Sequence, residues 1–238
     1  KKRVQEKLLS SERFFYQGIL TEDRIDQAID KVLRKVEKNI LILEDRFPTP
    51  ATNDNTYLAM DNTEWTNGFW TGILWLCYEV SGKKHFREAA EKNVQSFIYR
   101  IENEIEVEHH DLGFLYSLSC VSAYKLTGND DAKEAAIMAA EKLLKRYQSK
   151  GQFIQAWGEL GIQDNYRLIV DCLLNIPLLF WATTITKDER YREVAIKHYH
   201  TTIENAIRED SSAYHTFFFD AKTGEPLYGK TRQGYSDS

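Results

Sequence analysis

Two kinds of hydrophobic pattern alternate along the chain. In four segments apolar residues recur every three or four positions and charged residues fill the opposite face, which is typical of an amphipathic helix. Three segments between them are apolar nearly all round, which indicates buried helices. The amphipathic helices are expected over residues 21–44, 84–100, 130–147 and 188–208, and the buried ones over 68–80, 111–126 and 164–184. Pro177 should kink the last of these, because a proline inside a helix removes a backbone hydrogen bond.

An internal repeat marks the junctions between the two kinds of helix. Residues 82–90, 128–136 and 187–195 resemble one another, and each leads from a buried helix into an amphipathic one. Such hairpins predict an inner and an outer layer, as in an all-α (α/α)6 toroid. An open helical solenoid is the alternative, since it uses the same hairpins without closing a ring. Because seven helices do not close the ring of twelve, residues 1–238 are interpreted as one incomplete barrel domain, with the remaining helices expected after residue 238.

Composition indicates a globular chain. Hydrophobic residues make up 42% of the 238 positions and charged residues 28%, which excludes a disordered chain. No apolar run reaches the ~18 residues of a membrane span, and the net charge of −5 argues against a nucleic-acid partner. Three cysteines without a CxxC pair indicate a reducing compartment, so we expect a cytoplasmic protein. The apolar run 217–219, followed by a Thr223-Gly224 turn, predicts a short hairpin.

The chemistry is expected where the inner helices begin. Inner helices of a toroid run parallel, so the segments 65–68, 109–111 and 162–171 that precede or begin them should meet at one mouth. Asp171 is expected inside a buried helix, where burial favours the neutral acid and suits a general acid. Asp111 would supply a second carboxylate. Each has a simpler interpretation, Asp111 as a helix N-cap and Asp171 as a structural group bonded to its neighbours.

Other side chains at this mouth are candidates for binding a ligand. Trp65 precedes a buried helix and is the best candidate for stacking on a sugar ring, and Trp157 is another aromatic residue in a loop. His215 and Gln233 also lie in loop contexts, where an ordinary surface position is the alternative. No HExxH or clustered Cys/His spacing predicts a metal site, and no glycine-rich phosphate loop is present.

Four motifs together resemble unsaturated glucuronyl hydrolase, glycoside hydrolase family 88. They are EWTNGFWTG at 64–72, HHDLGF at 109–114, DNYRLIVD at 164–171 and QGYSD at 233–237. The resemblance extends from about residue 30 onward. It implies a six-hairpin α/α barrel that uses no metal and no organic cofactor.

The resemblance also implies a reaction and its partner. The substrate would be a glycosaminoglycan oligosaccharide whose non-reducing end is a 4,5-unsaturated uronic acid left by a polysaccharide lyase. The enzyme would hydrate the C4=C5 vinyl ether, after which the glycosidic bond breaks. The residue matching Asp171 protonates C4 and helps water add at C5, and the residue matching Asp111 binds ring hydroxyls.

By the same matching, Trp65 stacks on the sugar ring, and His110, His215 and Gln233 contact the sugar. Arg167 and Arg232 are candidates for steering the uronate carboxylate, and Trp157 is a further aromatic candidate. The family's Trp-Ala-Arg-Gly-Gln-Ala-Trp segment, expected after residue 238, is absent. A molecule of only these 238 residues is therefore expected to have little or no activity.

Three alternatives stay open. An unsaturated rhamnogalacturonyl hydrolase shares the barrel and the hydration chemistry but acts on pectin fragments. A non-catalytic helical-repeat carbohydrate-binding module would have a concave face without paired carboxylates, so Asp111 and Asp171 argue against it. An α/α-barrel epimerase would need a histidine pair, for which only His110 and His215 are available. Oligomeric state and sulfation preference stay undetermined.

Overall fold

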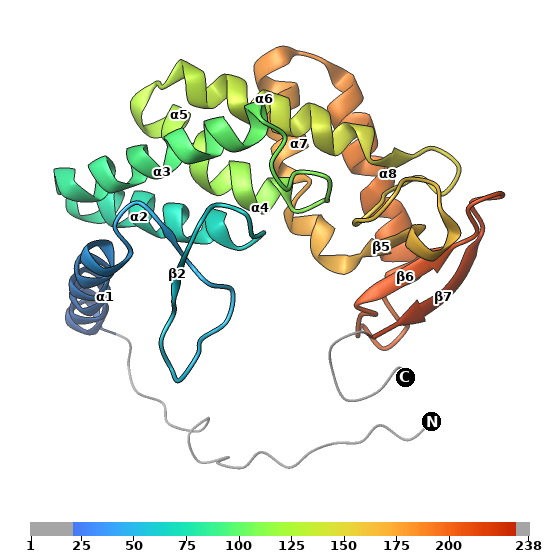
Figure 1. The fold of residues 1–238 in the computed structure, drawn as a ribbon. Helices are drawn as coiled ribbons and strands as arrows, with labels where there is room; N and C mark the ends of the chain where they lie inside the picture. The colour runs from blue at the N-terminus through green and yellow to red at the C-terminus, as the bar shows by residue number, and fades with distance from the viewer. Residues whose placement is uncertain (1–20, 232–238) are drawn as a thin grey trace, which may run out of the picture.

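The described residues form an open arc of helices that ends in a small sheet (Figure 1). The structure is a computed structural model, and it describes residues 21–231. The helices in this part are α1 (Glu22–Leu43), α2 (Asn67–Ser81), α3 (Lys84–Glu102), α4 (Leu112–Tyr116), α5 (Ser122–Thr127), α6 (Asp130–Lys145), α7 (Pro177–Thr186) and α8 (Glu189–Ala206). A π-helical turn, Ser117–Val121, joins α4 to α5, so the two form one continuous inner helix.

The helices alternate between two layers, as the hydrophobic pattern predicts. The apolar helices α2, α4–α5 and α7 each pack against the amphipathic helix that follows them. The outer helices contribute one face only: α3 buries Phe86, Val94 and Phe97, and α6 buries a row of alanines. One cluster of buried side chains extends from Leu33 of α1 to Ala195 of α8.

The repeated segments form the same turn three times. Gly82, Gly128 and Lys187 end α2, α5 and α7 in the left-handed conformation, with φ of 67°, 74° and 64°. Each donates its N–H to a carbonyl four residues earlier, which satisfies one free group at the helix end. Lysine replaces glycine in the third copy, and its Cβ makes that conformation less favourable.

The expected helix over 164–184 is wrong in its first half. Helix α7 begins at Pro177, which occupies the first helical turn and does not kink a longer helix. Before it lie β5 (Arg167–Ile169) and a 3-10 turn, Val170–Leu174. Proline suits the first helical position because the N–H that it lacks has no partner there. Asp171 therefore lies in a short turn before a helix.

Strand β5 extends the predicted C-terminal hairpin into a three-stranded sheet. The hairpin itself is confirmed, with β6 (Thr216–Phe219) antiparallel to β7 (Pro226–Lys230). Strand β5 pairs with the other side of β6, and Ile169 lies opposite Thr216. Phe153, Tyr166, Leu168 and Phe219 form a second buried cluster beneath this sheet. The sheet thus brings the turn with Asp171 next to His215.

Short antiparallel pairs connect the remaining elements. Strand β1 (Phe47–Pro48) pairs with β2 (Ala59–Met60), and β3 (Tyr147–Gln148) pairs with β4 (Phe153–Ile154). Over residues 21–231, no helix combines the length and the apolar character needed to cross a membrane.

Candidate active site

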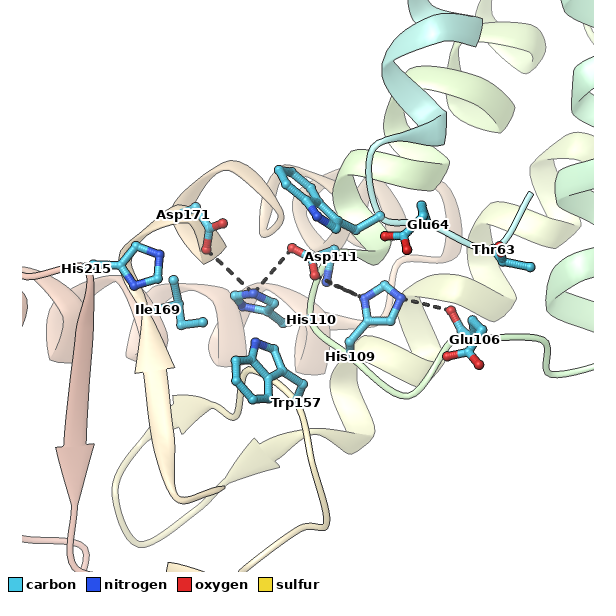
Figure 2. Close-up of a pocket in the computed structure, with 11 residues that line it drawn as sticks. Thr63, Glu64, Glu106, His109, His110, Asp111, Trp157, Ile169, Asp171 and His215 are labelled. Atoms are coloured by element: carbon cyan, nitrogen blue, oxygen red, sulfur yellow. Dashed lines mark hydrogen bonds and ion pairs between the residues drawn. The ribbon is translucent and has the colours of Figure 1, made fainter. Parts of the chain in front are cut away.

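A pocket of about 590 Å³ lies where the inner helices begin. Its walls come from the loop before α2, the loop before α4, the 155–158 loop, and the sheet with the turn that follows β5 (Figure 2). The lining residues are Thr63, Glu64, Trp65, Glu106, His109, His110, Asp111, Trp157, Ile169, Asp171 and His215. The structure thus brings together six of the predicted residues: Trp65, His110, Asp111, Trp157, Asp171 and His215. Arg232 and Gln233 lie outside the described residues.

One imidazole lies between the two aspartates. Nε2 of His110 is 3.3 Å from Oδ1 of Asp111 and 3.5 Å from Oδ1 of Asp171, as Figure 2 shows. The backbone N–H of His110 donates to the carbonyl of Ala156 at 2.7 Å, which ties this loop to the wall that carries Trp157. Asp111 precedes α4, yet its side chain makes no capping hydrogen bond, so its carboxylate faces the histidines.

Close backbone packing holds the two aspartates in one pocket. The Oδ1 atom of Asn175, which is fully buried, accepts the N–H of Phe114 at 2.7 Å and so connects the first turn of α4 to the segment after Asp171. A Cβ atom added to Gly113 would lie 2.3 Å from the Cα atom of Asn175. Only glycine allows this approach of α4 to residue 175.

The two carboxyl groups have pKa values shifted in opposite directions. Burial, and then the negative charge of Asp111, raise the pKa of Asp171 to about 6. Burial also opposes ionisation of Asp111, but the adjacent imidazoles of His110 and His109 and its own backbone N–H outweigh burial and lower the pKa of Asp111. At neutral pH Asp111 is ionised, and Asp171 keeps its proton in a minor fraction of the molecules, a fraction that grows as the pH falls toward 6. That division suits an acid beside a charged partner.

His110 is neutral at physiological pH. Burial lowers the pKa of His110 to about 4, although the charge of Asp111 partly offsets this. In the described part of the chain, His110, Asp111 and Asp171 also have ligand atoms within 4.8 Å of one another, so these three could hold a metal ion. Nδ1 of His110 is buried without a partner, whereas metal-binding histidines usually donate their second ring N–H to another group.

Two indoles line the pocket from different loops, Trp65 from the loop before α2 and Trp157 from the 155–158 loop. Trp65 is 42% exposed and packs on Phe114, with ring centroids 5.7 Å apart. Trp157 is stacked on the guanidinium of Arg167 at 3.9 Å. Arg167 is buried and does not line the pocket, so it does not contact a ligand there directly, and its role in steering a uronate carboxylate stays a prediction. It supports Trp157 from behind.

His215 joins the sheet to the turn that carries Asp171. Its backbone carbonyl accepts the N–H of Val170 at 3.0 Å, and Nδ1 of its ring contacts Oγ1 of Thr216 at 2.9 Å. Because β6 pairs with β5 in a fixed register, His215 lies directly beside the residues that precede Asp171. The imidazole of His215 faces the pocket in Figure 2.

Sequence reasoning placed His109 at the mouth without assigning it a role, and it missed the two pocket glutamates. Nε2 of His109 contacts the carbonyl of Glu106 at 2.9 Å, and Nδ1 lies 3.1 Å from the N–H of Asp111 and 3.2 Å from its Oδ2. The contacts at Nδ1 exclude one another, because a neutral ring accepts from the amide and a charged ring donates to the carboxylate. Glu64 and Glu106 add acidic groups, and no lysine or arginine is among the described lining residues.

An arc of α/α hairpins whose inner-helix N-termini surround an acid–base pair defines the class, an α/α-barrel protein with a pocket suited to sugar chemistry. A family model described as Glycosyl Hydrolase Family 88 matches residues 42–237. The chain belongs to this family. The mostly helical fold and the related structures confirm the predicted incomplete (α/α)6 barrel.

The chain is similar to named members of the family. It is 54% identical to the unsaturated chondroitin disaccharide hydrolase of Streptococcus pneumoniae, covering 100% of this chain and 60% of that protein. It is 43% identical to the unsaturated glucuronyl hydrolase of Bacillus sp. (strain GL1), covering 89% and 56%. The chain thus spans about 60% or less of the length of these relatives.

Solved structures agree with this assignment. The crystal structure of unsaturated glucuronyl hydrolase from Streptococcus agalactiae has a TM-score of 0.92 at 55% identity, covering 98% of this chain and 58% of that chain. A mutant of that enzyme complexed with dGlcA-GalNAc6S has a TM-score of 0.78 at 48% identity, with 98% and 56% covered.

Proposed function

We propose that the protein containing this chain releases a terminal 4,5-unsaturated glucuronic acid from glycosaminoglycan oligosaccharides. The observation that carries this proposal is the pair Asp111 and Asp171, which share one imidazole in a pocket and have opposite pKa shifts. The names of the relatives support the substrate class, and the saccharide bound to the mutant S. agalactiae enzyme is an unsaturated disaccharide.

The mechanism assigns a proton to each step. Protonated Asp171 transfers its proton to C4 of the vinyl ether, and the resulting carboxylate takes a proton from the water that adds at C5. The net change is addition of one water, which gives a hemiketal at C5. The hemiketal opens to a ketone, and the glycosidic bond then breaks to give a keto-acid and the shortened saccharide.

The other pocket residues would bind and orient the sugar. Ionised Asp111 accepts hydrogen bonds from ring hydroxyls, and neutral His110 keeps both carboxyl groups at fixed positions. Trp65 offers an exposed indole face for stacking on the ring. Trp157 and His215 complete the opposite wall, and Arg232 and Gln233 stay predicted contacts.

The test follows the ultraviolet absorbance of the conjugated double bond with full-length protein and an unsaturated chondroitin disaccharide. Asp171→Asn should lower kcat by about 10²- to 10⁴-fold, because it removes the proton donor. Asp164→Asn is the matched control, since Asp164 is a nearby exposed aspartate outside the pocket. Wild-type turnover in Asp171→Asn would refute the acid assignment. Activity only on pectin-lyase products would favour the rhamnogalacturonyl alternative.

We also infer a single α/α domain and a cytoplasmic location. The buried cluster that runs from α1 to α8 supports one domain over residues 1–238. The free, buried Cys77, Cys120 and Cys172 support a reducing compartment.

A further inference from the structure

Arg100 on α3 is a buried arginine that bonds two loops of the pocket wall. Arg100 is 1% exposed, and all five N–H groups of its guanidinium have acceptors. Nε donates to the carbonyl of Ile105 at 3.1 Å, Nη1 to Oδ1 of Asn62 and the carbonyl of Glu64 at 3.0 Å each, and Nη2 to the carbonyls of Thr63 at 3.3 Å and Glu106 at 2.7 Å.

The loop that contains residues 104–106 has an unfavourable backbone conformation. Glu104 and Glu106 have φ of 54° and 45°, a region that residues with a Cβ seldom adopt. The guanidinium of Arg100 bonds the carbonyls of Ile105 and Glu106, which precede and follow the Cα atom of Glu106. Such conformations persist where the surroundings over-determine them, and here the guanidinium supplies that constraint.

The bond to Glu106 continues to the aspartate pair. The Glu106 carbonyl also lies 2.9 Å from Nε2 of His109, and a carbonyl can only accept, so Nε2 of His109 carries a proton. The amide N–H of Asp111 donates to the other ring nitrogen at 3.1 Å. The sequence Arg100, Glu106 carbonyl, His109, Asp111 is therefore a continuous chain of hydrogen bonds.

We propose that Arg100 is a positioning residue. Through the Glu106 carbonyl it holds His109 in the Nε2–H tautomer, and His109 in turn positions Asp111. The bonds from Arg100 to residues 62–64 also fix the loop that presents Trp65. The catalytic part of this inference rests on the function proposed above. Lysine cannot replace arginine here, because an ammonium group has three donors and lacks the planar fork that reaches both loops.

The experiment compares Arg100→Lys with Arg87→Lys in the full-length protein. Arg87 is on the same helix, but it is partly exposed, its guanidinium pairs with Glu91, and it does not line the pocket. Nitrogen-15 NMR of labelled histidine, assigned with a His109→Gln variant, reports the tautomer of His109. Turnover of the unsaturated disaccharide reports kcat and KM separately.

Arg100→Lys should lose the dominant Nε2–H form of His109, lower kcat/KM by about 10- to 100-fold and raise KM, while Arg87→Lys keeps wild-type values. A folded Arg100→Lys protein with the wild-type tautomer would overturn the proposal, since a merely structural arginine would alter stability alone. If Arg100→Lys does not fold, Asn62→Ala tests the same proposal, because it removes one acceptor of the Arg100 guanidinium. It should shift part of the His109 population to the other tautomer and lower kcat/KM by about threefold to fivefold, and a wild-type tautomer would overturn the proposal.

Failure of the proposed function gives a different result. If the wild-type protein does not act on the disaccharide, the function is refuted, and the NMR comparison still tests the link from Arg100 to His109.

Discussion

At the scale of single residues, burial of Asp171 beside a neutral imidazole lets two aspartates sixty positions apart differ in charge. The neutral ring of His110 brings one nitrogen to both carboxyl groups but adds no positive charge at physiological pH. The charge of Asp111 therefore acts on Asp171 without a compensating cation between them. The pair resembles other sites in which environment separates the pKa values of two carboxyl groups.

This arrangement predicts the pH dependence of turnover. The mechanism proposed above needs protonated Asp171, so kcat/KM should fall on the alkaline side with a midpoint near pH 6, the pKa of that group. Asp111→Asn removes the negative charge that raises this pKa, so the alkaline midpoint should move to lower pH. A pH series of initial rates measures the alkaline midpoint in the wild-type protein and in the variant. An unchanged midpoint in the variant would contradict the coupling.

Sequence patterns predicted that the two aspartates share a pocket, but not which residues support them. Asp111 and Asp171 were predictable because both lie where inner helices begin. The roles of Arg100 and His109 were not, because an arginine in an amphipathic helix and a histidine in a polar loop have the same pattern as solvated residues. Their contacts distinguish them: Arg100 is buried and bonds residues 62–64, and the ring of His109 contacts Glu106 and Asp111.

At the scale of elements, the predicted start of α7 depended on whether Pro177 was taken as a kink inside a helix or as its first residue. A short apolar run such as 168–170 fits a buried helix and a buried strand equally well. The structure has strand β5 there, because the run pairs with β6. Proline at the first turn of α7 is the signal that would have corrected the boundary.

The hairpin turns allow a matched stability test. Lys187→Gly should stabilise the fold by about 0.5–1 kcal/mol, because glycine adopts the left-handed conformation without a Cβ penalty. Gly128→Ala should destabilise the fold by about 1 kcal/mol, because alanine adopts the left-handed conformation less readily. An added Cβ at this position meets no atom within 4 Å, so no steric clash adds to that conformational penalty. Urea unfolding measures both changes. Equal signs for the two variants would contradict this explanation.

At the scale of the whole molecule, buried histidines couple stability to pH. His198 of α8 accepts the N–H of Ile154 through Nδ1 at 3.0 Å, and burial, with a smaller effect of His110, lowers the pKa of His198 to about 3. In the unfolded chain this histidine takes up a proton with a pKa of about 6.5, whereas in the folded protein it stays neutral until about pH 3. The contribution of neutral His198 to folding stability is therefore complete above pH ~6.5 and decreases as the pH falls toward 3. His110 acts in the same direction.

Unfolding free energies should therefore decrease between pH 6.5 and 4. His198→Asn keeps an acceptor for Ile154 but does not titrate, so its slope should be smaller by about 1.4 kcal/mol per pH unit. Chemical denaturation at several pH values measures both slopes. Identical slopes would show that His198 is not the group responsible.

The π-helical turn at Ser117–Val121 has a consequence for the geometry of the inner helix. A π turn holds one residue more than an α turn, and one residue corresponds to about 100° of rotation around a helix axis. Asp111 and Gly128 lie at opposite ends of this helix, the first lining the pocket and the second turning the chain into α6. The widened turn sets their relative azimuth, so deleting a single residue there would turn the carboxylate away from its partner while both flanking segments stayed helical.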